Sequence, residues 1–189
     1  MRRSNLMIGF AILTVFLFCG VTSAPAADHA LVGVKKCKTC HKKEKDGNQY
    51  GKWLESGHAK AFETLAGDKA MEIAKGKGIE NPQAATECLE CHVTALPVMD
   101  DLVNQKITME EGVSCESCHG AGKDYYKKKT MKAITAGEVD GAELGLITPN
   151  EETCVKCHND KSPTFDGFDF DEMFEKIAHP KPEVEAAAG

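Results

Sequence analysis

Apolar positions form one long unbroken stretch near the start of the chain and only short groups after it. Residues 6–21 are almost wholly apolar, follow two arginines, and precede an Ala-Pro-Ala sequence that ends at Ala26. A basic start, a short apolar segment and a small-residue cleavage site are typical of a secretory signal peptide. The pattern predicts a signal peptide over residues 1–26. This run of 16 residues is short for a membrane span of about 20 residues, so we expect no stable membrane anchor.

Residues 27–189 fit a single mature domain, with a frayed tail over residues 182–189. Within this domain, apolar positions recur with helical spacing only in short segments. The predicted helices cover residues 48–65, 69–75, 125–135 and 170–178. Stretches rich in glycine, proline and polar residues separate them and predict loops. We therefore expect a mainly α fold of short helices and long loops, with little or no sheet.

The sequence Cys-x-x-Cys-His occurs four times. The motif cysteines are Cys37 and Cys40, Cys88 and Cys91, Cys115 and Cys118, and Cys154 and Cys157, and the motif histidines are His41, His92, His119 and His158. Two thiols at this spacing can each form a thioether to one haem, and the next residue, histidine, can then bind the iron. The motifs therefore predict four covalently attached haem c groups, around which the short helices and loops are wrapped.

Zinc binding and thiol redox chemistry are the alternative interpretations of paired cysteines. A zinc site needs a second pair of ligands for each Cys pair, and a thioredoxin-like dithiol does not require a histidine after every pair. Removal of the signal peptide also removes Cys19, so the other eight cysteines all belong to motifs. The motif starts are 51, 27 and 39 residues apart, and the second and third haems, the closest in sequence, are expected to lie together.

Composition agrees with a core built partly from cofactor. Only 42% of residues are apolar and 6% aromatic, which suits a domain in which macrocycles replace side chains. The formal charge of −6 becomes −8 once the two arginines near the start are removed. An acidic chain is a poor candidate for binding nucleic acid. Lysine clusters at residues 35–43 and 127–129 form either solvated faces or a docking patch for an acidic redox partner.

Each haem iron has a second axial position, and the sequence has too few histidines to occupy all four. Beyond the motif histidines, only His29, His58 and His179 are present. At least one haem of a monomer must therefore have another ligand or an open position.

Several segments resemble the tetrahaem cytochrome c-554 family. They are Gly33-Val-Lys-Lys-Cys37-Lys-Thr-Cys40-His41, the stretch from Trp53 to His58-Ala-Lys-Ala-Phe-Glu-Thr-Leu65, Gly112-Val-Ser-Cys115-Glu-Ser-Cys118-His119-Gly120, and Phe170-Asp-Glu-Met173. The resemblance implies four haems in edge-on and stacked pairs, three with two histidine ligands and the second five-coordinate. It also implies a role as electron acceptor or relay for multihaem oxidoreductases.

Carried over to this sequence, the resemblance makes His58 the distal ligand of the fourth haem and His179 that of the third. The haem of His92 is then the open one. The family also has a histidine about ten residues after the third motif for the first haem, but residues 125–132 contain none. Met131 is the natural substitute, because a thioether can bind haem iron, and His29 is a competitor. The segment over residues 162–170 is shorter than the family's, in which a longer insert helps to cover the open haem.

The sequence is compatible with three functions. The first is an exported electron carrier, located in the periplasm or outside the cell, whose partner is a multihaem oxidoreductase or a membrane quinol-linked cytochrome. The second is a redox enzyme acting on a small nitrogen oxide at an open haem. The third is a subunit of a haem-lined extracellular filament, with His29 donated to a neighbouring subunit. The oligomeric state is not predicted by the sequence.

Overall fold

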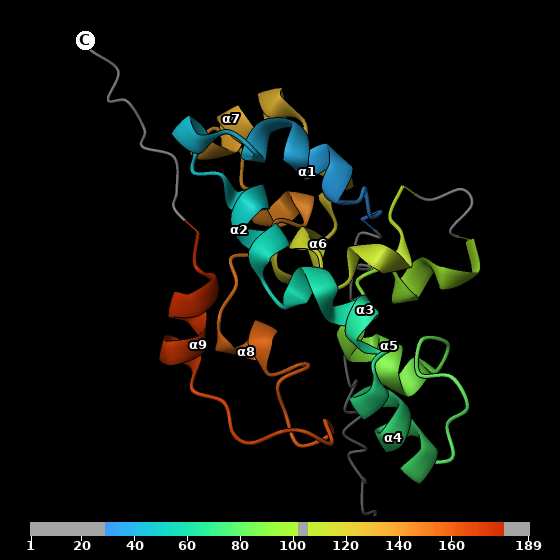
Figure 1. Ribbon diagram of the computed structural model, residues 1–189. Helices are drawn as coiled ribbons and strands as arrows, with labels where there is room; N and C mark the ends of the chain where they lie inside the picture. The colour runs from blue at the N-terminus through green and yellow to red at the C-terminus, as the bar shows by residue number, and fades with distance from the viewer. Residues whose placement is uncertain (1–28, 102–105, 180–189) are drawn as a thin grey trace, which may run out of the picture.

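A computed structural model of the chain describes residues 29–101 and 106–179, and Figure 1 shows their arrangement. The predicted signal peptide and the tail over residues 182–189 lie outside these residues. The α-helices are α1 (Val34–His41), α2 (Gln49–Glu55), α3 (Ala61–Thr64), α4 (Asp68–Gly76), α5 (Thr86–His92), α6 (Cys115–His119), α7 (Lys128–Thr135), α8 (Glu151–Cys154) and α9 (Phe170–Ile177). Short 3₁₀ helices are η1 (Glu44–Asp46), η2 (His58–Lys60), η3 (Leu96–Asp101), η4 (Met109–Glu111), η5 (Gly122–Asp124) and η6 (Ala142–Leu144). No strand occurs in the described part, which confirms the mainly α prediction.

Two of the predicted helices, α4 and α9, have nearly the expected bounds, and α7 begins later than expected. The helix predicted over residues 48–65 is instead divided into α2, η2 and α3. The break falls at Ser56, whose backbone is extended (φ −78°, ψ 161°). Glycine follows at position 57 and costs about 1 kcal/mol relative to alanine inside a helix. The apolar residues of this stretch therefore lie on three short helices that change direction from one to the next.

Most of the motifs lie at the ends of short helices. Helices α1, α5 and α6 end on His41, His92 and His119, whereas the fourth motif begins at the last residue of α8 and continues in a turn. Residues three and four positions apart share one face of a helix. Both motif thiols and the histidine therefore point from one face of each of these helices, which is the geometry that a single flat cofactor requires.

The described helices form an elongated arrangement (Figure 1). Helices α1 and α7 lie at one end, α2 and α6 in the middle, and α3, α5 and α4 toward the other end, while α8 and α9 flank the middle. The apolar core is small and centres on Leu65, Leu89 and Val93, with Phe62 and Met109 packed against them. This core joins α3 to α5 and so fixes the second motif against the segment that carries His58.

Candidate functional site

The motif cysteines approach one another in pairs drawn from different motifs. The thiols of Cys37 and Cys115 form a hydrogen bond, which lowers the pKa of Cys37 and raises that of Cys115. A second thiol contact joins Cys91 to Cys157, and burial together with this contact raises the pKa of Cys157. The first motif therefore lies against the third, and the second lies against the fourth.

A third contact links the two pairs. Burial raises the pKa of Cys118, and the neighbouring Cys154 raises it further. Cys118 also lies near Cys157. The four motifs thus follow one another in space in the order first, third, fourth, second, which differs from their order along the chain.

The second and third motifs, expected to lie together, do meet, but through their flanking backbone. The hydroxyl of Thr94 accepts a 2.7 Å hydrogen bond from the N–H of Ser114 and lies 2.5 Å from the hydroxyl of Ser117. The N–H of Thr94 also donates a 2.9 Å hydrogen bond to the carbonyl of Gly112. This joint holds the two motif segments together, while their cysteines face the first and fourth motifs.

Two motif histidines each face a histidine from outside the motifs. The ring centres of His58 and His158 are 6.0 Å apart, and those of His119 and His179 are 5.9 Å apart. An imidazole nitrogen binds a metal ion such as Zn²⁺ at about 2.0–2.1 Å, so two imidazoles on opposite sides of one ion have ring centres about 6 Å apart. Both pairs therefore have the spacing that two axial ligands of one iron require. Among the described residues, His41 and His92 have no such partner.

Three motif histidines are held by their Nδ1 atoms. Nδ1 of His41 lies 3.1 Å from Oε1 of Gln49. Nδ1 of His92 lies 2.7 Å from the carbonyl oxygen of Ala61, and Nδ1 of His119 lies 3.3 Å from that of Ile147. A hydrogen bond at one ring nitrogen fixes the tautomer and leaves the other nitrogen as the ligand. Nε2 is thus the free nitrogen of each of these rings.

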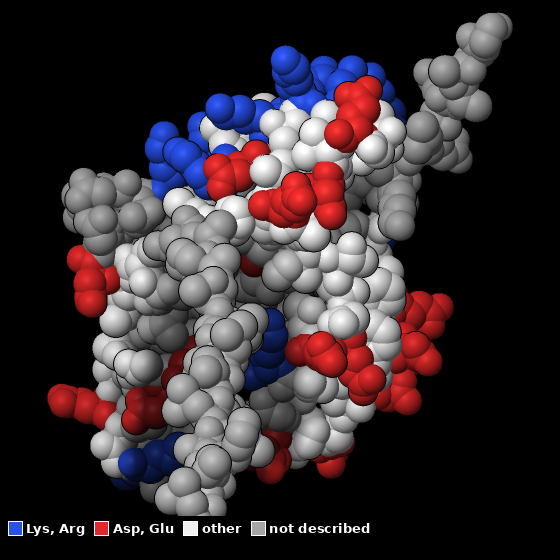
Figure 2. Space-filling model, turned by 180° about the vertical axis from the view of Figure 1, so that it is seen from behind, with Lys and Arg blue, Asp and Glu red and all other residues white. Residues whose placement is uncertain are grey.

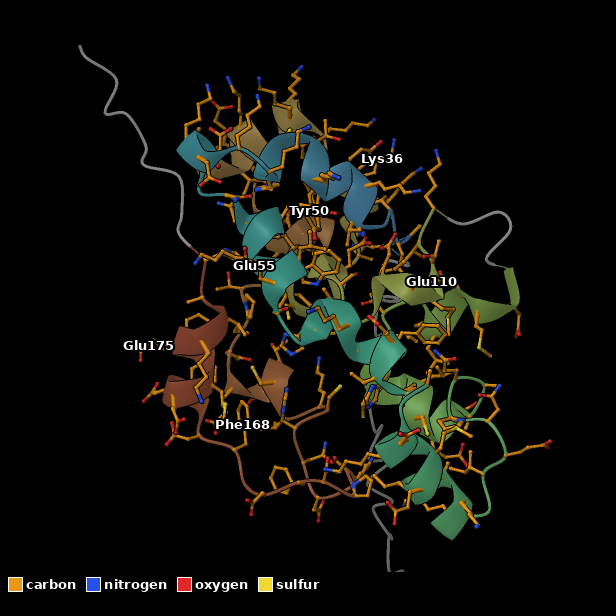
Figure 3. The ribbon with its side chains drawn as sticks, viewed as in Figure 1. Lys36, Tyr50, Glu55, Glu110, Phe168 and Glu175 are labelled. Atoms are coloured by element: carbon orange, nitrogen blue, oxygen red, sulfur yellow. The ribbon has the colours of Figure 1, made fainter. Side chains whose placement is uncertain are left out.

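A ring contact orients His158, and burial affects the pKa of histidines in both pairs. The ring of His158 stacks on Phe168, with ring centres 5.0 Å apart and planes inclined by 26°, and Figure 3 shows Phe168 on the segment that leads into α9. Burial lowers the pKa of His58, and the nearby His158 lowers it further. Burial also lowers the pKa of His119 and of His179. The lowered pKa values favour the neutral imidazole, which is the form that binds metal ions.

His58 is positioned by the chain immediately before the third motif. The N–H of Val113 donates a 3.0 Å hydrogen bond to the carbonyl of His58, and the indole N–H of Trp53 donates a 2.8 Å bond to the carbonyl of Val113. Gly112 has a positive φ of 60°, and a Cβ atom at this position would lie 2.6 Å from the carbonyl oxygen of His58. Only glycine allows this close approach.

The two remaining candidate ligands have different surroundings. His29 is half-buried, its Nδ1 lies 2.7 Å from Oδ2 of Asp124, and its ring occupies the space beside Gly145. Met131 is half-buried on α7, and α7 lies at the same end of the molecule as α1 (Figure 1). His29 is therefore engaged by side chains of its own chain, and Met131 lies on a helix near the first motif.

Two buried glutamates that sequence reasoning missed join the first motif to the third. The carboxylate of Glu116, inside the third motif, accepts hydrogen bonds from the N–H groups of Val32, Gly33 and Gly122 at 2.6–3.1 Å. Glu111 accepts a 2.9 Å bond from the N–H of Val34, the first residue of α1. Carboxylates at a helix N-terminus bind its free N–H groups and favour its dipole. In the sequence, the position of Glu116 between two motif cysteines is the only sign that one of these glutamates has a structural role.

Comparisons with known proteins agree with this arrangement. Residues 36–120 match the family model described as cytochrome c554 and c-prime. Cytochrome c-554 of Nitrosomonas europaea is 30% identical over 167 residues, covering 77% of this chain and 69% of that protein. The chain belongs to the cytochrome c-554 family. The solved structure of the reduced state of cytochrome c554 from the same organism matches with a TM-score of 0.55 and 27% identity, covering 81% of this chain and 86% of that chain.

Membership of the cytochrome c-554 family makes this chain a c-type cytochrome that acts in electron transfer. The family carries covalently bound haem c, and the Cys-x-x-Cys-His motifs supply the chemistry for that attachment. Haem supplies one-electron chemistry when bound, and the chain supplies the axial ligands and surroundings that set its potential. Within the described residues, we find no helix with the length and apolar character needed to cross a membrane.

Proposed function

We propose that this chain is an exported tetrahaem cytochrome that relays electrons between redox proteins. Each motif holds one haem c by two thioether bonds, and its histidine is the proximal iron ligand. The attachment residues are Cys37, Cys40, Cys88, Cys91, Cys115, Cys118, Cys154 and Cys157, and the proximal ligands are His41, His92, His119 and His158. The proposal includes a signal peptide over residues 1–26 and a mature domain over residues 27–189.

The spacing of the two histidine pairs carries this proposal. His58 faces His158, and His179 faces His119, each at the ring separation of two ligands on one iron. We assign His58 to the fourth haem and His179 to the third. Both assignments agree with those implied by the family resemblance, and the ring separations support them.

The contacts between motifs support a relay. The cysteines that hold the macrocycles touch in the order first, third, fourth and second motif. Macrocycles attached to touching cysteines lie close together, so electrons can pass along this series one step at a time. We propose that the haems of His41 and His92 are the two ends of the relay, with the bis-histidine haems between them.

The two end haems differ in their distal ligands. We propose Met131 for the haem of His41, because α7 lies at the end of the molecule that carries the first motif (Figure 1) and His29 is already engaged by Asp124. His92 faces no described imidazole, and this supports an open iron there. An open iron favours a second function, reduction or oxidation of a small nitrogen oxide. Turnover of nitric oxide by the purified protein would establish that function.

Export and partners complete the proposal. We place the mature protein in the periplasm and expect its partner to be a multihaem oxidoreductase or a membrane quinol-linked cytochrome. Size-exclusion chromatography of the wild type and of His29→Ala tests whether it acts as a monomer or assembles through His29.

Intact-mass measurement of the purified protein tests the core of this proposal. We expect a chain that begins after Ala26 and carries four haem c groups. Replacement of Cys154 and Cys157 by alanine should remove one haem, whereas Cys19→Ala should change neither haem content nor mature mass. A mature protein with fewer than four haems, or one that retains residues 1–26, would contradict it.

A further inference from the structure

Lysine side chains gather at one end of the molecule. Residues 34–46 and 122–132, called the lysine face below, hold eleven lysines and three acidic residues, although the whole chain has a formal charge of −6. Figure 2 shows most of the basic side chains of that view at the end where Figure 1 draws α1 and α7. The two segments meet, since Nζ of Lys36 lies 5.8 Å from the ring centre of Tyr126. The N–H of Lys123 also donates to the carbonyl of Ala30, just before the first segment, at 3.1 Å.

The lysines of the lysine face are largely open to solvent and outnumber the acidic residues among them. All of its lysines except the half-buried Lys36 are exposed. In the part of the chain that the structure describes, the ion pairs are His29 with Asp124 and Lys176 with Glu172. No lysine of the face is in either pair. Unpaired charges of one sign on one surface produce a field that attracts an oppositely charged protein and speeds its association.

A small hollow lies at the edge of the lysine face. Its volume is about 120 Å³, and it is lined by Lys36, Lys123 and Tyr126 of the face and by Ala30, Leu31, Val32 and Lys106 beside it. Figure 3 labels Lys36 at this end of the molecule. Ammonium groups around a hollow of this size favour a carboxylate, so a protruding aspartate or glutamate side chain of a partner would fit there.

The lysine face surrounds the first motif. Helix α1 carries Cys37 and Cys40 and, on the same short segment, the exposed Lys35 and Lys38. A protein docked on this face would therefore lie against the haem attached at the first motif, at one end of the series of motif contacts. We propose that the lysine face is the docking site for an acidic redox protein, which exchanges electrons with the haem of His41. This proposal rests on the proposed relay function and names where that relay meets its partner.

A second copy of this chain is the other acidic molecule that could dock here. Its acidic side chains outside the lysine face are spread over most of the described helices, and the densest group lies on α9 and the segment before it. The chain as a whole has a formal charge of −6, so two copies repel each other, and this opposes docking of a second copy. An acidic redox protein with a concentrated acidic patch matches the lysine face better.

The experiment uses the haem-loaded protein and a flavodoxin as an acidic probe. Reduced flavodoxin gives one electron, its anionic hydroquinone becoming the neutral semiquinone, and one haem iron passes from Fe(III) to Fe(II). Stopped-flow absorbance measures the second-order rate, and carbodiimide cross-linking followed by mass spectrometry identifies which lysines lie against probe carboxylates. The test variant is Lys42→Glu with Lys128→Glu. The matched control, Lys69→Glu with Lys75→Glu, makes the same change of charge on α4.

We expect the test variant to lower the rate about tenfold or more at low salt, and the control variant to lower it far less. The difference should vanish between about 0.01 M and about 1 M salt, because salt screens the attraction. Cross-links should concentrate on the lysine face. Equal effects of the two variants, or cross-links spread evenly over all lysines, would overturn the docking site while leaving the relay intact. Self-association at low salt that the test variant abolishes would assign the face to a second copy instead. Failure of every haem to accept electrons would overturn the relay itself.

Discussion

The carboxylate of Glu116 accepts a 2.8 Å hydrogen bond from the N–H of Gly33, 83 residues earlier in the chain. Glu116 lies between the two cysteines of the third motif, and Gly33 is the residue that precedes α1 and the first motif. Gly33 has a positive φ of 74°, and a Cβ atom there would lie 2.5 Å from the carbonyl oxygen of Lys106. One buried side chain and one glycine thus hold the first motif at a fixed distance from the third.

Glu116→Gln tests the hydrogen bonds by which Glu116 holds the first motif. The amide has one acceptor oxygen where the carboxylate has two, so its NH₂ group would face a backbone N–H. Hydrogen bonds to a charged group are worth about 1.5–3 kcal/mol, and we expect a loss of that size in the free energy of unfolding. Guanidinium denaturation of the haem-loaded protein measures it. Glu90→Gln is the control, because Glu90 also lies inside a motif but is exposed; equal losses in both variants would show that these hydrogen bonds are unimportant.

Glu111 predicts a dependence of stability on pH. Burial raises its pKa above the ordinary value of 4.5, and the negative charge of Glu116 adds to the increase. The hydrogen bond from the N–H of Val34 and the positive charge of Lys35 oppose it. The folded protein therefore binds this proton more tightly than the unfolded chain, so the carboxyl stabilises the fold below the ordinary pKa and loses that contribution as pH rises through the raised value. We expect the free energy of unfolding of the wild type, relative to Glu111→Gln, to fall as pH rises above 4.5. A constant or rising difference would contradict this.

The two histidine pairs predict separate spectroscopic changes. His58→Ala should convert one low-spin haem to high spin, and His179→Ala should convert a different one, because each removes one axial ligand. Electron paramagnetic resonance of the oxidised protein counts both. His29→Ala serves as the comparison and should leave every signal unchanged. A loss of low-spin signal in His29→Ala, with none in His179→Ala, would reassign the ligand.

Met131 predicts a methionine–iron signature at the first haem. A thioether ligand raises the potential of a haem relative to a second histidine. We expect a methionine–iron absorbance band in the oxidised protein and its loss in Met131→Ala, together with a fall in the highest of the haem potentials. Met71→Ala is a matched control, since Met71 is exposed on α4. If the wild type lacks the band, the assignment of Met131 is wrong.

Gly112→Ala should disturb both stability and His58. Residues other than glycine are strained by about 1–3 kcal/mol in such a backbone conformation, and the added Cβ atom would also meet the carbonyl of His58. We expect a loss of at least this size in thermal or guanidinium unfolding, with a changed low-spin signal from the haem of His158. Gly137→Ala has a similar positive φ of 72° but open space around it. It should lose less stability and keep its spectra.

The sequence predicted the fold class and α4 and α9 well, because their apolar spacing and the residues that end them are local signals. It failed at residues 48–65, where the bonds of Trp53 and His58 to Val113, a distant segment, favour three short helices over one long helix. The same limit applies to the site. Spacing identified the motifs, but Glu116 and Thr94 act through residues far along the chain, which no local pattern indicates.

The order in which the motifs touch has a consequence for how the molecule is made. The second motif emerges early in synthesis, but its cysteine neighbour belongs to the fourth motif, which is made last. The first and third motifs can meet once residue 119 has been made, whereas the contact between the second and fourth motifs forms only after residues 154–158 have been made. A chain that stops before the fourth motif would keep the lysine face, the Glu116 hydrogen bonds and the Thr94 contacts, yet the second motif would lack the cysteine contact that places it at the end of the series.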